Sequence, residues 1–93
     1  MAQKPIHPGA ILKDMLDKHR LSMTALSDKI YVPVNRPSQI INGKRRITAD
    51  TAMRLGIFFE IEPEYFLNLQ RDYDLAIAQI ENNEIYEKIK PKR

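Results

Sequence analysis

Eight polar residues lie within the twelve-residue stretch 35–46, and their side chains suit the recognition of nucleic acid. Asn and Gln can bond bidentately to adenine and Arg to guanine, so a first group suits contacts to base edges. That group is Asn35, Arg36, Ser38 and Gln39. A second group suits phosphate oxygens, which position a protein without conveying sequence. That group is Asn42, Lys44, Arg45 and Arg46. The alternative interpretation is a small helical hairpin with a solvated polar face.

Residues that could support catalysis or hold a metal are scattered along the chain. His7 and His19 lack metal-ligand spacing, and the three glycines are too far apart to form a phosphate-binding loop. Asp72 and Asp74 lie two positions apart on a predicted helix and therefore point in different directions. We expect no catalytic residue, no metal site and no cofactor.

Residues 23–42 have the pattern of a helix-turn-helix, which would position the polar cluster. Ser22 is a suitable N-cap, and Leu26 and Ile30 lie four apart on one face of the first helix. A turn follows, and Gly43 suits the end of the second helix because glycine tolerates left-handed backbone. In this motif the N-terminal side chains of the second helix face base edges in the major groove.

The flanking residues predict further helices within a single all-α domain that spans residues 1–93. Residues 1–7 show no periodicity, so we expect an extended arm that leads to a helix starting at Pro8. Thr48 suits the N-cap of the fourth helix, which should end near Glu60.

Pro63 opens a last helical region over residues 63–90, with an apolar stripe that little remaining chain can cover. An uncovered stripe of this kind predicts a dimer interface. The residues expected there are Phe66, Leu69, Tyr73 and Ile77. Asn82-Asn83 predicts a break, with a short helix over residues 84–90 beyond it. Packing of the stripe against the first helix is the alternative.

Charge is distributed unevenly along the chain. Residues 1–56 contain 10 Lys and Arg against 4 Asp and Glu, a net charge of +6, whereas residues 57–93 contain 5 against 8, a net charge of −3. A basic first half is typical of a surface that binds a polyanion, and the acidic second half suits a protein partner. The chain has no cysteine and no long apolar run, so we expect a soluble cytoplasmic protein that does not enter a membrane.

Several short motifs, in order from about His7 to Leu75, resemble the HigA/VapI-like antitoxins, a branch of the lambda-repressor-like (Xre-type) helix-turn-helix regulators. The motifs are His7-Pro8-Gly9, Asn35-Arg36-x-Ser38-Gln39-Ile40-x-Asn42-Gly43-Lys44, Ile47-Thr48-Ala49-Asp50-Thr51-Ala52, and Leu67-Asn68-Leu69-Gln70 followed by Tyr73-Asp74-Leu75.

The resemblance implies a five-helix lambda-repressor-like fold and a homodimer that binds a palindromic DNA operator in its own promoter. It also implies a partner toxin similar to HigB, a messenger-RNA endonuclease that the antitoxin neutralises. The resemblance supports base contacts from the cluster at 35–39, backbone contacts from Lys44 and Arg45, and dimerisation through the last long helix. Two alternatives remain: a solitary phage-type repressor, and a protein-interaction module that has lost DNA binding.

Four residues depart from the family pattern. Tyr31 and Glu60 stand where glycine is usual, so a left-handed backbone at either position would be strained. Val34 replaces a polar or basic residue of the recognition helix. Pro37 replaces Ile or Leu and would kink a helix that began at Pro33. We therefore predict a kink or a delayed start, with Asn35 or Arg36 as the N-cap and Pro37 inside the first turn.

Overall fold

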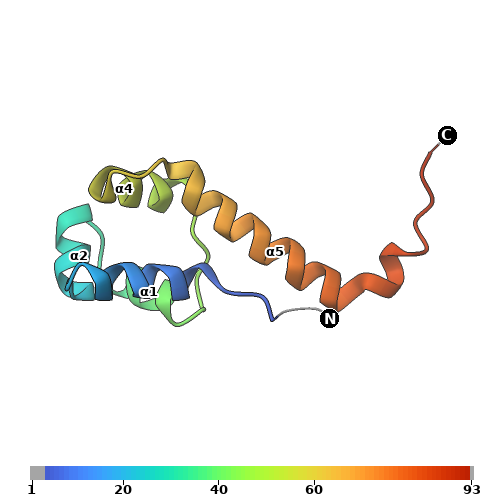
Figure 1. Ribbon diagram of the computed structural model, residues 1–93, viewed down its shortest axis with the longest axis horizontal. Helices are drawn as coiled ribbons and strands as arrows, with labels where there is room; N and C mark the ends of the chain where they lie inside the picture. The colour runs from blue at the N-terminus through green and yellow to red at the C-terminus, as the bar shows by residue number, and fades with distance from the viewer. Residues whose placement is uncertain (1–3, 93) are drawn as a thin grey trace.

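The computed structural model describes residues 4–92, which form five α-helices and no strand (Figure 1). Their bounds are α1 Pro8–Lys18, α2 Met23–Ile30, α3 Asn35–Ile41, α4 Ala49–Phe59 and α5 Pro63–Tyr86. Helices α1 to α4 and the first part of α5 surround one core, and the rest of α5 extends away from it (Figure 1). The predicted all-α, five-helix fold with a long C-terminal helix is confirmed.

Local sequence signals account for the start of α1. Pro8 occupies the first helical position, and the Gly9 N–H donates to Nδ1 of His7 over 2.9 Å, so the imidazole caps the helix. Gly9 lies against the end of α3, where an added Cβ would collide with the carbonyl oxygen of Ile40 and lie 2.7 Å from its carbonyl carbon. Glycine therefore allows α1 and α3 to pack closely.

Helix α2 begins as predicted, because Oγ of Ser22 accepts from the Ala25 N–H over 3.0 Å. It ends at Ile30, and the C-cap Tyr31 has the left-handed backbone that the sequence analysis identified as strained for a tyrosine (φ 61°, ψ 47°). Glu60 ends α4 in the same conformation (φ 57°). Both non-glycine residues therefore occupy backbone that favours glycine.

The delayed start of α3 is confirmed, although its cap is not the predicted one. The helix begins at Asn35, so Pro37 lies in the first turn, where its missing N–H does little harm. The cap is Val34 rather than Asn35 or Arg36, and no side chain bonds to the free N–H groups. Pro37 is fully buried, which shows that its ring occupies a core position.

Helix α4 follows Thr48, which occupies the N-cap position without making a side-chain capping bond. Gly56 permits a close approach of the chain that leads into α5, because a Cβ there would lie 2.6 Å from the Ile61 carbonyl oxygen. The core contains ten apolar residues from all five helices and the connecting segments. They are Leu12, Leu16, Leu26, Ile30, Val32, Ile40, Ile47, Ala52, Leu55 and Phe66.

The end of α5 agrees with the prediction except in its length. Asn82 has non-helical backbone angles (φ −132°, ψ 18°), which confirms the predicted break at Asn82-Asn83, and a short helical segment follows it. This segment was predicted over residues 84–90, but it ends at Tyr86, so its predicted end is wrong. Within residues 4–92, no helix is both long and apolar enough to cross a membrane.

Candidate nucleic-acid interface

One face of α3 presents polar side chains to solvent. Asn35, Ser38, Gln39 and Asn42 follow the spacing i, i+3, i+4, i+7, which places them on a single helix face. Asn35, Gln39 and Asn42 are exposed, and Ser38 is half-buried. Pro37 and Ile40 are buried and hold the helix against the core. Core packing therefore turns the amide side chains outward together.

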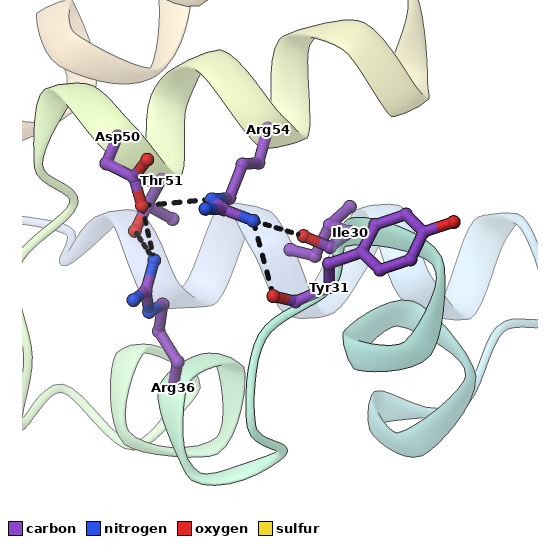
Figure 2. Close-up of polar contacts among 6 residues, drawn as sticks. All are labelled: Ile30, Tyr31, Arg36, Asp50, Thr51 and Arg54. Atoms are coloured by element: carbon purple, nitrogen blue, oxygen red, sulfur yellow. Dashed lines mark hydrogen bonds and ion pairs between the residues drawn. The ribbon is translucent and has the colours of Figure 1, made fainter.

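Arg36 does not join that face, because it is bound to α4. Its Nη1 donates to Oδ2 of Asp50 over 2.7 Å and lies 3.5 Å from Oγ1 of Thr51, and 27% of the side chain is exposed (Figure 2). The same Asp50 oxygen accepts from Nε of Arg54 over 3.0 Å. Arg36 therefore belongs to a polar cluster within the protein in the absence of DNA.

Arg54 extends this cluster to the end of α2. Its Nη1 donates to the carbonyl oxygens of Ile30 and Tyr31, over 2.8 and 3.3 Å (Figure 2). These carbonyls belong to the last residues of α2, which have no partner within the helix. Hydrogen bonds from Arg36 and Arg54 hold the pKa of Asp50 below its ordinary value, so the carboxylate stays ionised at neutral pH.

The segment after α3 carries the predicted phosphate-contacting cations. Gly43 has φ 75°, and the Lys44 N–H donates to the Gln39 carbonyl over 2.8 Å, so α3 ends in a Schellman-type cap. Lys44 and Arg45 are exposed and form no ion pair within residues 4–92. Both cations are therefore available to an anionic ligand beside the amide face of α3.

Arg46 is held against α5. Its Nη2 donates to Oδ2 of Asp74 over 2.7 Å, while Oδ1 of Asp74 accepts from Nε2 of Gln70 over 2.9 Å. The buried Gln70 also accepts from the Ile47 N–H over 2.8 Å. Burial would raise the pKa of Asp74, but the hydrogen bonds from Arg46 and Gln70 and the Arg46 charge outweigh it and lower the pKa.

Sequence reasoning missed four residues that fix the predicted cations and the loop beside them: Asp50, Arg54, Gln70 and Asp74. Asp50 lies in the first turn of α4, where an acidic residue is favourable. That position explains the residue without reference to Arg36 or Arg54. The Arg36–Asp50 and Arg46–Asp74 pairs span 14 and 28 residues, so no local pattern could have found them.

The four residues predicted for a dimer interface fall into two groups. Phe66 is 1% exposed and belongs to the core, so its side chain is not available to a second subunit. Leu69, Tyr73 and Ile77 are half-buried on α5. Leu69 and Tyr73 line an open groove of about 340 Å³ beside Pro5 and Ile6 of the arm. The structure thus leaves three of the four side chains accessible on one helix.

A polar helix face that follows a turn, with exposed cations at its end, is typical of a helix-turn-helix DNA-binding protein. A family model described as helix-turn-helix matches residues 12–66. Virulence-associated protein I of Dichelobacter nodosus is 40% identical over 81 residues, which cover 86% of this chain and 75% of that protein. This family consists of DNA-binding regulators rather than enzymes, and residues 4–92 hold no group of side chains that could bind a metal ion.

Solved structures narrow the class. An addiction-module antidote protein of the HigA family from Coxiella burnetii is 40% identical with a TM-score of 0.89, covering 97% of this chain and 100% of that one. The Pseudomonas aeruginosa antitoxin HigA, solved with the higBA promoter, is 37% identical with a TM-score of 0.90 over the same fractions. The chain belongs to the helix-turn-helix family, in its HigA-like antitoxin branch.

Proposed function

We propose that this protein is the antitoxin and autorepressor of a toxin–antitoxin pair and binds a palindromic operator in its own promoter. The observation that carries the proposal is the exposed amide face of α3, with Lys44 and Arg45 at its end. Asn35, Ser38 and Gln39 contact base edges, and Asn42, Lys44 and Arg45 contact phosphates. Support comes from the similar Pseudomonas aeruginosa antitoxin, which was solved with promoter DNA.

The operator-binding form is a homodimer. Leu69, Tyr73 and Ile77 of α5 form the contact with the second copy, since they are accessible on a helix that extends beyond the core. The two recognition helices would then lie about 34 Å apart, one turn of B-DNA, in successive major grooves. Repression is steric, because the bound dimer occupies the promoter.

The protein partner is a toxin similar to HigB, an endonuclease of messenger RNA. The acidic second half of the chain is suited to a basic protein of this kind. Copurification with the product of an adjacent gene, together with relief of that product's toxicity on coexpression, would support this assignment. If no neighbouring product binds, the protein is a solitary repressor.

The first test is a gel shift on the protein's own upstream DNA and on unrelated DNA, at low and moderate salt. A discrete, salt-sensitive complex with the upstream DNA alone supports the operator-binding dimer. Equal binding to both DNAs, or to neither, contradicts sequence-specific repression by the protein alone. Repeating the assay with the neighbouring gene's product then tests whether repression requires the toxin.

Gln39 provides the sharpest test of base reading. Gln39→Ala should remove about 1–3 kcal/mol of discrimination at one base pair, because a bidentate contact to adenine is lost. Binding to a panel of single-substitution operators measures this loss. Gln79→Ala is the matched control, since Gln79 is an exposed glutamine on α5, outside the proposed DNA interface. Unchanged discrimination in Gln39→Ala would argue against this role.

Ile77 tests the dimer. Ile77→Asp should convert the dimer to a monomer, because it places a charge within the proposed apolar contact. Light scattering coupled to gel filtration measures the mass of the assembly. Ile57→Asp is the control, since Ile57 is 73% exposed on α4. A dimer that survives Ile77→Asp would exclude this part of α5 as the interface.

A further inference from the structure

Pro37 and Ile40 pack the recognition helix α3 against the core, and polar contacts hold its N-terminal end. The helix has only seven residues, and no side chain bonds to the N–H groups of its first turn. The preceding turn contains the left-handed Tyr31 and the rigid Pro33. Isolated helices of this length are unstable in water, so tertiary contacts must set the direction of α3.

Asp50 and Arg54 fasten both ends of that turn to α4. At the far end, Nη1 of Arg36 from α3 donates to Oδ2 of Asp50 over 2.7 Å. At the near end, Arg54 donates to the Ile30 carbonyl of α2 over 2.8 Å, and its Nε donates to the same Asp50 oxygen over 3.0 Å (Figure 2). A single carboxylate oxygen therefore connects α2, α3 and α4.

We propose that Asp50 is a positioning residue that determines how sharply the protein discriminates between DNA sequences. It acts through Arg36 and Arg54, which hold the N-terminus of α3 at a fixed angle, and Asp50 itself does not contact DNA. Arg36 then has a structural role within the protein and does not contact guanine. This inference rests on the proposed DNA-binding function. It attributes part of the sequence specificity to contacts among Arg36, Asp50 and Arg54, which lie outside the exposed polar face of α3.

The charges of the cluster agree with this role. An isolated carboxylate beside a DNA-binding helix would repel phosphates, but Asp50 lies between two guanidinium groups, so the three side chains together carry a charge of +1. If Arg36 left to contact a base, Asp50 would keep only Arg54 as its partner. In its observed position, Arg36 therefore stabilises the Asp50 carboxylate.

The contacts of Asp50 with Arg36 and Arg54, together called the clamp, should affect discrimination between DNA sequences more than the stability of the protein. The Asp50 side chain is 56% exposed, and exposed ion pairs add little to the free energy of folding. Asp50→Asn should therefore leave Tm within about 2 °C of the wild type. The ratio of affinities for the upstream duplex and a scrambled duplex of equal length should fall about tenfold, because base contacts lose their alignment. Fluorescence anisotropy with the two labelled duplexes measures this ratio.

Matched variants separate positioning from charge. Asp28→Asn removes the same charge from α2, where Asp28 is exposed and forms no ion pair within residues 4–92. Asp28→Asn should keep the wild-type ratio, and Asp50→Glu should restore most of it, since a longer carboxylate still accepts from both arginines. Equal ratios for Asp28→Asn and Asp50→Asn would overturn the proposal.

Arg36→Lys distinguishes a structural role of Arg36 from a contact with a base. Arg36 meets Asp50 through Nη1 alone, so a lysine ammonium can replace that contact, whereas lysine cannot reproduce the planar fork that arginine presents to guanine. The proposal expects discrimination within about twofold of the wild type in Arg36→Lys. A loss of discrimination of tenfold or more that is confined to one G·C pair would identify Arg36 as a base contact and refute its structural role.

Amide hydrogen exchange of the free protein tests the clamp without DNA. Asp50→Asn should accelerate exchange of the N–H groups of Ile40 and Ile41 relative to Asp28→Asn, because the N-terminal turn of α3 then loses its Arg36 contact with α4 and opens more readily. Unchanged exchange would overturn the clamp. If exchange accelerates but the wild type binds both duplexes equally, the clamp stands and the proposed DNA-binding function fails.

Discussion

Replacing Tyr31 by glycine should stabilise the protein. Tyr31 has φ 61° and ψ 47°, a left-handed conformation that brings Cβ of an L-residue close to the following carbonyl oxygen. The conformation is held in place because the N–H groups of Tyr31 and Val32 both donate to the Ser27 carbonyl oxygen. The strain therefore cannot relax while the end of α2 stays intact.

The expected gain follows from three contributions. Left-handed backbone costs a non-glycine residue about 1–2 kcal/mol, and glycine loses about 0.5–1 kcal/mol more backbone entropy on folding. The Tyr31 side chain is 87% exposed, so removing its ring sacrifices little packing. The net stabilisation is about 0.5–1 kcal/mol, which should raise Tm by roughly 4 °C in a domain of this size.

Urea denaturation and calorimetry measure the change, and Tyr31→Ala provides the control. Alanine removes the ring but keeps Cβ, so Tyr31→Ala should be no more stable than the wild type. Glu60→Gly should show a similar gain, since Glu60 has φ 57° and is also exposed. If Tyr31→Gly were no more stable than Tyr31→Ala, backbone strain would not explain the cost of this turn.

Two further changes test the junction of α1 with the rest of the core. Gly9→Ala should cost about 2 kcal/mol or more in urea denaturation, because the added methyl group collides with the Ile40 backbone and α1 must move. Partial burial lowers the pKa of His7 despite the nearby Asp74 charge, so the stability that neutral His7 contributes should be lost as pH falls below about 6.5. A protonated Nδ1 also cannot accept from the Gly9 N–H. His7→Asn keeps a capping acceptor without titrating, and should therefore lose less stability between pH 7 and 5 than the wild type.

The starts of the helices could be predicted because their signals act within one turn of chain. Ser22 bonds to an N–H three residues away, and Pro8 and Pro63 occupy first helical positions. Pro37 was informative for the same reason, since its steric limits act on the residues just before it. The Val34 cap could not be foreseen, because no side chain there forms a bond that a pattern would indicate.

The break in α5 could be predicted from Asn82-Asn83, but the end of the helical segment beyond it could not. Helical backbone resumes at Asn83, whose carbonyl accepts from the Glu87 N–H, and the segment ends at Tyr86. Residues 79–92 are exposed, so no packing fixes where this segment ends. The burial of Phe66 could not be read from the stripe either, since its spacing does not indicate which member meets α4 and which meets solvent.

The ion pairs change how the basic half of the chain should be interpreted. Of the cations near α3, Arg36 and Arg46 are neutralised by Asp50 and Asp74, and only Lys44 and Arg45 lack a partner within residues 4–92. A dimer that uses these two per subunit neutralises about four phosphates, for a slope of log affinity against log salt near −3.6. Recruiting all four cations would give about eight phosphates and a slope near −7. Filter binding over a salt series distinguishes these values, and a slope near −7 would show that DNA draws Arg36 and Arg46 away from their carboxylates. The net charge of +6 in residues 1–56 therefore overstates the field that DNA meets, because folding brings Asp74 of the acidic half beside the cations of the basic half.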